Sequence, residues 1–151
     1  MDNDDIVDIL NDLIETTKDG EYGFRTSAER AHSANVKATL NSRAASCAAA
    51  AAELQALVRQ YGGEPEDDGT ALGAAHRGWV AMKAAMSTSA REDHAILEEC
   101  ERGEDKAVNT FRKAAQETAL PADVRAVIER QLQGARANHD QVKALRDATK
   151  V

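Results

Sequence analysis

Two glutamates stand at positions where a helical pattern calls for apolar residues. Glu21 lies about 50° from the centre of an apolar stripe when each residue turns the helix by about 100°, and Glu104 interrupts a second stripe. The stripes consist of Ile6, Leu10, Leu13, Thr17, Phe24 and Ala28, and of Ile96, Cys100, Ala107 and Phe111. A carboxylate in a packing seam needs a cation, polar hydrogen-bonding groups or water beside it. The sequence leaves these three alternatives open.

Chain reversals expected near residues 34 and 119 indicate which side chains share the level of these glutamates. The predicted polar layer comprises Glu21, Cys47, Cys100, Glu104, Gln131, Asn138 and His139. Glutamate, histidine and thiolate together can bind one metal ion. A network joining the carboxylates to Gln, Asn and His side chains would also satisfy these groups, and it is our leading interpretation. Cys47 and Cys100 fall on inward faces, so we interpret them as buried, reduced thiols.

The elements that must position this layer are helices. Aromatic residues make up only 3% of the chain, alanine is abundant, and there are no runs of β-branched residues, so the composition favours helices over a β-sheet. Gly20 and Gly23 interrupt the first pattern and indicate either the close approach of another helix or a local distortion beside Glu21. Four long helices are predicted. The first begins at a cap at Asn3 or Asp4 and ends at about His32, and the second follows a break at 33–35 and ends at Tyr61. The third covers about 89–118, and the fourth begins at Pro121 and ends at about Ala148.

The lengths of the connections predict the topology. Short links at 33–35 and 119–121 make the first and second helices antiparallel, and likewise the third and fourth. The connection over 62–90 begins at a helix stop, contains a short helix over about 70–86, and is long enough to span the bundle. The sequence therefore predicts an all-α, ferritin-like four-helix bundle, with a helix-containing crossover between the second and third helices. Residues 1–151 are expected to form one domain.

Composition and charge exclude several classes of function. The net charge is −7, with 26 acidic and 19 basic residues and no basic patch, which argues against nucleic acid as a partner. The acidic N-terminus lacks the features of an export signal, and no window approaches 18 apolar residues, so we expect no membrane association and a cytoplasmic location. We find no phosphate loop, no nucleophile with a base at recognisable spacing, and no zinc-type cysteine pairs.

Six segments carry a resemblance to a known family. They are LNDLIE at 10–15, DGEYGF at 19–24, ELQ at 53–55, GGEP at 62–65, HRGW at 76–79 and ECERGED at 99–105. The chain resembles an uncharacterised bacterial family, described as a four-helix-bundle domain of unknown function within the ferritin-like superfamily. The resemblance implies a fold but no activity. We interpret the segment from His76 to Trp79 as a packing clasp for the crossover, with a partner or ligand surface as the alternative.

The superfamily's dinuclear iron or manganese site sets a pattern that this chain follows only in part. Such a site takes one Glu from each of two helices and a Glu-x-x-His pair from each of the other two. Glu21 and Glu104 satisfy the first requirement. The paired motif is missing, because Ala56 stands three positions after Glu53 where a histidine is needed, and Arg136 stands three positions before His139 where a glutamate is needed. The leading hypothesis is therefore a non-enzymatic or vestigial bundle without a cofactor.

Three functions remain open at this stage. The non-enzymatic bundle would self-associate as a homo-oligomer or bind another protein through its helical surface. The alternative is an iron- or manganese-binding protein or oxidoreductase of the ferritin-like class, with Glu21, Glu53, Glu104 and His139 as the best candidate ligands. A ligand pocket between the crossover and the bundle is the third.

Overall fold

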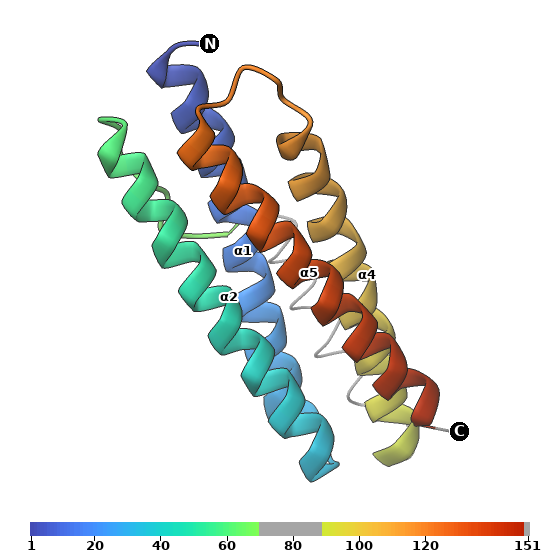
Figure 1. The fold of residues 1–151 in the computed structure, drawn as a ribbon. Helices are drawn as coiled ribbons and strands as arrows, with labels where there is room; N and C mark the ends of the chain where they lie inside the picture. Colours follow the sequence, from blue (N-terminus) through green and yellow to red (C-terminus); the bar gives the residue numbers. More distant parts are fainter. Residues whose placement is uncertain (70–88, 150–151) are drawn as a thin grey trace.

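The computed structural model describes residues 1–69 and 89–149, and these form four long helices (Figure 1). They are α1 (Asn3–Arg30), α2 (Ala34–Gln60), α4 (Ser89–Ala115) and α5 (Ala122–Ala148). The short helix predicted over 70–86 and the segment from His76 to Trp79 lie outside the described residues. The all-α prediction is confirmed for the part of the chain that the structure describes.

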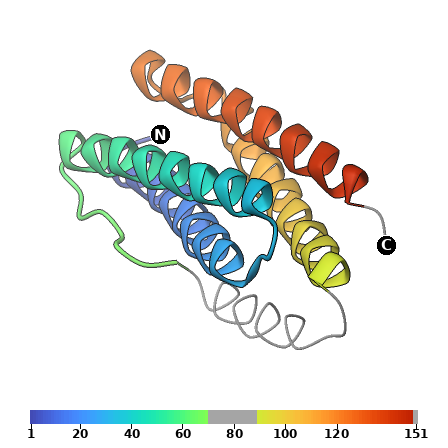
Figure 2. The same cartoon turned by 90° about the horizontal axis from the view of Figure 1, so that it is seen from below.

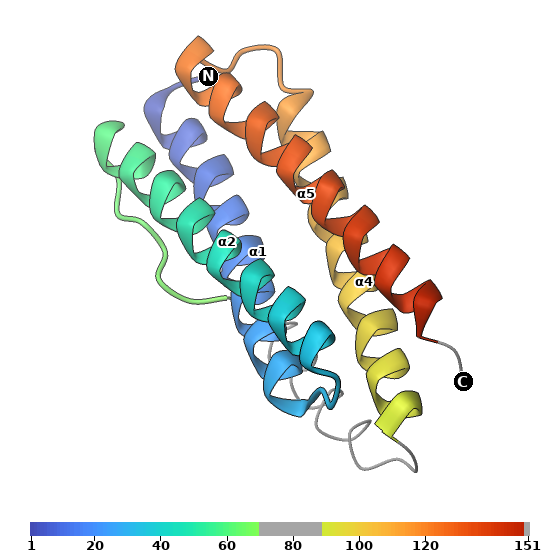
Figure 3. The same ribbon diagram turned by 60° about the horizontal axis from the view of Figure 1, so that its bottom comes forward.

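The helices form two antiparallel hairpins, one of α1 and α2 and one of α4 and α5 (Figure 2). The hairpins meet chiefly where α1 packs on α4, whereas α2 and α5 touch at few points. Helices α2 and α4 run in the same direction, as the long connection between them requires (Figure 3). The predicted topology is therefore confirmed, and it brings side chains from all four helices toward one interior.

The helix starts differ slightly from the prediction. Asp2, rather than Asn3 or Asp4, caps α1, and its side chain and that of Asp5 form a reciprocal capping box. Pro121 occupies the cap position of α5 instead of its first turn. Both shifts are one or two residues, because several neighbouring residues are suited to these positions.

The end of α2 follows the predicted glycine stop. Gly62 has a φ of 82°, a left-handed conformation that glycine adopts without steric cost. The N–H of Gly63 donates to the carbonyl of Val58 at 3.0 Å, and that of Gly62 donates to Arg59 at 3.0 Å. These two bonds define a Schellman motif, so local sequence alone fixes where α2 ends.

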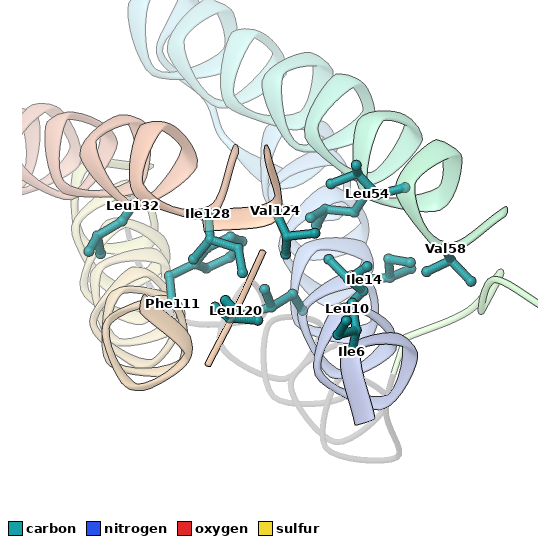
Figure 4. Packing of buried hydrophobic residues seen from close by; sticks show 12 residues of the cluster. Ile6, Leu10, Ile14, Leu54, Val58, Phe111, Leu120, Val124, Ile128 and Leu132 are labelled. Carbon is teal, nitrogen blue, oxygen red and sulfur yellow. The ribbon is translucent and has the colours of Figure 1, made fainter. Parts of the chain in front are cut away.

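The core consists of two apolar clusters separated along the bundle axis. The first, at the end where α2 stops and α5 begins, contains Ile6, Leu10, Leu13, Ile14, Leu54, Leu57, Val58, Phe111, Leu120, Val124, Ile128 and Leu132 (Figure 4). The second, at the opposite end, contains Phe24, Ala28, Ala31, Val36, Leu40, Ala44, Ile96, Leu97, Cys100 and Val142. Between them lie the levels of Glu21 and Glu104, where the sequence predicted polar residues.

Gly20 lies at the level between the two clusters. A Cβ atom on Gly20 would stand 3.1 Å from the Sγ atom of Cys47 on α2, which is closer than a comfortable van der Waals contact. The prediction that a glycine in the first helix marks the close approach of another helix is therefore confirmed for Gly20.

Asp93 on α4 holds the turn between α1 and α2. Its carboxylate accepts hydrogen bonds from the backbone N–H of His32 at 2.8 Å and of Ser33 at 2.9 Å, and the residue is only 4% exposed. The Ser33 side chain in turn caps α2 by accepting from the N–H of Val36. A negative charge at this point also complements the positive end of the α2 dipole.

We expect Asp93→Ala to lower the free energy of unfolding by about 2 kcal/mol, because two charge-assisted hydrogen bonds are lost and water replaces them only in part. Urea denaturation at neutral pH measures the change. Glu129→Ala, on the exposed face of α5, is the control and should be close to neutral. Equal effects of the two substitutions would show that Asp93 does not clamp the turn.

Candidate functional site

Glu21 is half-buried and fully engaged by cations on its own helix. Its Oε1 atom lies 3.3 Å from the Nζ of Lys18, and its Oε2 atom accepts from Arg25 one turn later. Burial alone would raise the pKa of Glu21, but the hydrogen bonds from Arg25 and Lys18 hold that pKa below its ordinary value. This carboxylate therefore stays charged with both oxygens occupied.

Glu53 joins α2 to α5. Its Oε2 atom accepts from Arg130, and its Oε1 atom accepts from the Nε2 of Gln131 at 2.8 Å. Burial opposes ionisation, but the bonds from Arg130 and Gln131 lower the pKa of Glu53. Glu53 is half-buried, and its two partners place it on the side of α2 that faces α5.

Glu104 is more deeply buried than Glu21 and Glu53. It is 4% exposed, and its Oε1 atom is buried with no hydrogen bond among residues 1–69 and 89–149. Burial raises the pKa of Glu104 to about 7, although the positive charge of Arg43 on α2 and the nearby His139 on α5 act in the opposite direction. Within the described residues the predicted network does not satisfy every group, since the Oε1 atom of Gln131 is also buried without a hydrogen bond there.

Both cysteines are free, as the sequence suggested. Cys100 is buried and its thiol donates to the Oγ of Ser27 at 3.5 Å, whereas Cys47 is half-buried. Burial, reinforced by the negative charge of Glu104, raises the pKa of each thiol to about 12. Neutral thiols are weak nucleophiles and weak metal ligands, so neither group suits thiolate chemistry at neutral pH.

His139 lies beside two acids that the sequence analysis did not single out. Its Nε2 atom is 2.7 Å from Oδ1 of Asp105 and 3.5 Å from Oε1 of Glu101. Among the described residues, these three side chains are the set of metal-ligating groups found within reach of one another. The spacing of Glu101 and Asp105, four residues apart on one helix face, was the available signal.

A cavity of about 960 Å³ touches both apolar clusters, since its wall includes Phe111 of the first and Phe24 of the second. Glu104 is part of its wall, and so are Gln131 and both cysteines. The small and apolar residues of the wall include Gly20, Gly23, Phe24, Ala107, Phe111, Gly134 and Ala135. Charged and polar residues also line it, among them Asp12, Glu15, Glu99, Arg102, Lys106 and Arg130. All four helices contribute to the wall. The cavity therefore lies at the level for which the sequence predicted an interior polar layer.

Comparison with known proteins gives the family. The sequence profile of the family described as a domain of unknown function (DUF2383) matches residues 5–117, which is most of the chain. The chain belongs to this family. No match was found among curated proteins. The DUF2383 assignment confirms the resemblance to an uncharacterised family, and it brings no activity with it.

The fold of this DUF2383 member is ferritin-like. A mutant of Mycobacterium smegmatis Dps1 matches it with a TM-score of 0.76 at 13% sequence identity, covering 95% of this chain and 96% of that one. At this identity the match shows the fold alone. No helix within residues 1–69 and 89–149 is long and apolar enough to cross a membrane.

The residues of this DUF2383 domain do not fit the dinuclear metal centre that the superfamily implies. Lys18 and Arg25 form ion pairs with Glu21, and Arg130 forms one with Glu53, so the charges of these acids are already neutralised. The four candidate ligands also form no single group in the described parts of the chain, where His139 clusters with Glu101 and Asp105 instead. We therefore derive no chemistry from a dinuclear centre.

Proposed function

We propose that this protein is a non-enzymatic ferritin-like bundle that binds a small, mainly apolar molecule in the cavity between its helices. The observation that carries the proposal is the buried Oε1 atom of Glu104 on the wall of that cavity, which has no hydrogen bond with any residue of 1–69 or 89–149. Buried polar atoms without a partner are rare in folded proteins, and each calls for an explanation. A ligand that donates a hydrogen bond to Glu104 supplies one.

The size and lining of the cavity support a small molecule as the occupant. Ligand sites in proteins typically measure roughly 300–1,000 Å³ and combine an apolar wall with a few convergent polar groups. The present cavity is about 960 Å³, and Phe24 and Phe111 provide aromatic surface within it. Glu104 and Gln131 are the polar residues of the wall that have a buried oxygen without a hydrogen bond to any described residue.

The chemistry of the unpartnered atoms narrows the ligand class. The Oε1 atoms of Glu104 and Gln131 are both without hydrogen bonds in the described parts of the chain, and the Oε1 of Gln131 is an amide oxygen, which only accepts. A ligand matched to this pair carries at least one N–H or O–H donor on an otherwise apolar body. An amine or alcohol fits this description, whereas a pure hydrocarbon leaves both atoms unsatisfied.

A pair of matched probes tests the proposal. We expect 1-aminonaphthalene to bind saturably, one per chain, and to bind at least about 5-fold more tightly than 1-methylnaphthalene, because one hydrogen bond contributes roughly 1 kcal/mol. In Glu104→Leu this preference for the amine should disappear. Fluorescence titration measures both affinities. Equal affinities of the two probes for the wild-type protein would refute the role of Glu104.

Filling the cavity provides an independent prediction. A Cβ atom added at Gly134 meets no other atom within 4 Å, so this wall residue tolerates a larger side chain. We expect Gly134→Ala to raise the free energy of unfolding by about 1 kcal/mol through helix propensity. Gly134→Leu should be similarly stable but should weaken 1-aminonaphthalene binding at least tenfold, since its side chain occupies the cavity.

Gly134→Ala is the matched control for Gly134→Leu, because both remove the glycine and only leucine fills space. Urea denaturation and the fluorescence titration are performed on both proteins. Unchanged probe binding in a folded Gly134→Leu protein would place the probe outside the cavity, and the proposed function would then be rejected.

The homo-oligomer and the cytoplasmic location stay predictions. Sedimentation velocity over increasing protein concentration checks the first, and a strict monomer at high concentration would contradict it. The iron- or manganese-binding alternative has its own check. Elemental analysis of protein purified from cells grown with both metals should show near-stoichiometric metal, lost in the Glu21→Ala, Glu104→Ala double variant, if that alternative holds.

A further inference from the structure

We infer that Glu101, Asp105 and His139 form a mononuclear site for a divalent transition-metal ion at the seam between α4 and α5. This site would be distinct from the dinuclear centre of the superfamily. None of the three residues lines the cavity, so the inference does not depend on the proposed function. It rests on the spacing of their donor atoms, on the environment of the imidazole, and on the groups behind each ligand.

The donor atoms lie close enough together for one ion to reach all three. The Nε2 of His139 lies 2.7 Å from Oδ1 of Asp105 and 3.5 Å from Oε1 of Glu101, and all three donor atoms lie within 4.8 Å of one another. An ion that holds nitrogen and oxygen at about 2.1 Å keeps neighbouring donors roughly 3.0–3.5 Å apart in octahedral or tetrahedral geometry. Small side-chain adjustments therefore bring all three groups onto one ion.

The two carboxylates do not form a well-oriented hydrogen bond with the Nε2 atom of His139. Although Nε2 of His139 is within contact distance of both carboxylates, it is buried and makes no hydrogen bond of acceptable geometry with any described residue. On the opposite side of the ring, Nδ1 lies 3.3 Å from Oδ1 of Asp140. A proton on Nδ1 donates to Asp140 and leaves the Nε2 lone pair free to bind a metal, as is common for metal-binding histidines.

The acids are held in place by their own surroundings. The Oε2 atom of Glu101 accepts from Arg146 on α5, which leaves Oε1 turned toward His139. The side chains of Glu101 and His139 are 13% and 19% exposed, and that of Asp105 is 60% exposed. Two ligands are thus fixed, and the third stands at the surface, where an ion can arrive from solvent.

The donor set selects the class of ion. Two carboxylates and one imidazole favour zinc or another first-row divalent transition metal over magnesium or calcium, which prefer oxygen ligands alone. Asp105 and Glu101 supply negative charge for a divalent cation, although Arg146 already balances part of the charge of Glu101, and water completes the coordination. A simple ion pair between a protonated His139 and Asp105 is the competing explanation.

Titration of the chelator-treated full chain with Co²⁺ tests the inference. We expect one Co²⁺ per chain with a visible absorption band, displaced by Zn²⁺. Asp105→Asn and His139→Gln should each weaken Co²⁺ binding by more than about 100-fold, because loss of an outer-shell partner alone weakens metal binding by roughly 10- to 100-fold. Asp105 is exposed, so its substitution should leave folding intact. Circular dichroism verifies that each variant is folded.

His94→Gln is the matched control, since the Nε2 of His94 also pairs with a carboxylate, Glu98, at 2.8 Å on the same helix. Its Co²⁺ affinity should equal that of the wild-type protein. A Cys47→Ala, Cys100→Ala double variant should also retain binding. Absence of saturable Co²⁺ or Zn²⁺ binding, or equal losses in His94→Gln and His139→Gln, would overturn the inference and leave the ion pair.

Discussion

At pH 8 we expect Glu104→Gln to raise the free energy of unfolding by about 3 kcal/mol relative to the wild-type protein. The reason is that the wild-type fold must keep a carboxylate ionised in a place where it has no hydrogen-bond partner among the described residues. Burial raises the pKa of Glu104 from 4.5 to about 7, and each unit of pKa difference corresponds to about 1.4 kcal/mol. Glutamine has nearly the same shape and carries no charge.

The sign of the pH dependence follows from the direction of this shift. Between about pH 4.5 and pH 7 the folded protein retains a proton on Glu104 that the unfolded chain has lost. Its contribution therefore makes wild-type stability fall as the pH rises through this window. Below about pH 4.5 the carboxyl is neutral in both states, so the wild-type protein and Glu104→Gln should differ little there.

Urea denaturation from pH 4 to pH 9 in the presence of EDTA measures the difference between the two proteins at each pH. Glu129→Gln, at an exposed position on α5, should show no such dependence. Arg43→Met should raise the pKa of Glu104 further, because Arg43 is the cation that favours its ionised form. A wild-type-to-Glu104→Gln difference that stays constant over this range would mean that Glu104 titrates like an exposed acid.

The helices and their order were predictable because local chemistry fixes them. The glycines at 62 and 63 end α2 by a motif that needs no tertiary partner, and the lengths of the connections determine the directions. The inward position of Glu104 followed from its angle on an apolar stripe, and its 4% exposure confirms that position. A strongly periodic segment thus specifies which face is buried.

The partners of the acids were harder to predict. Arg25 follows Glu21 by four residues, so that pair was visible in the sequence and explains why Glu21 does not need an interior partner. The pairing of Glu53 with Arg130 joins residues 77 positions apart. Asp93 caps a turn about 60 positions away in sequence. Such contacts depend on the rotation of each helix about its axis, which periodicity alone leaves uncertain by part of a turn.

Because the core consists of two separate clusters, we expect substitutions in one cluster to affect the free energy of unfolding independently of substitutions in the other. Leu54 belongs to the first cluster and Leu40 to the second, and both are fully buried. We expect Leu54→Ala and Leu40→Ala each to lower the free energy of unfolding by about 3 kcal/mol, the typical sum of lost apolar transfer and cavity formation. The double variant should lose the sum to within about 0.5 kcal/mol, because the two sites share no contacts.

Urea denaturation in sucrose, which strengthens the folded state, keeps the double variant measurable. The matched control is Leu54→Ala with Val124→Ala, since these residues pack in the same cluster (Figure 4) and their effects should not add. Strong coupling between Leu40 and Leu54 would mean that the two clusters act as one core across the level of Glu104. Additivity instead implies that this level contributes little packing energy, so the bundle can keep a ligand cavity there without losing its fold.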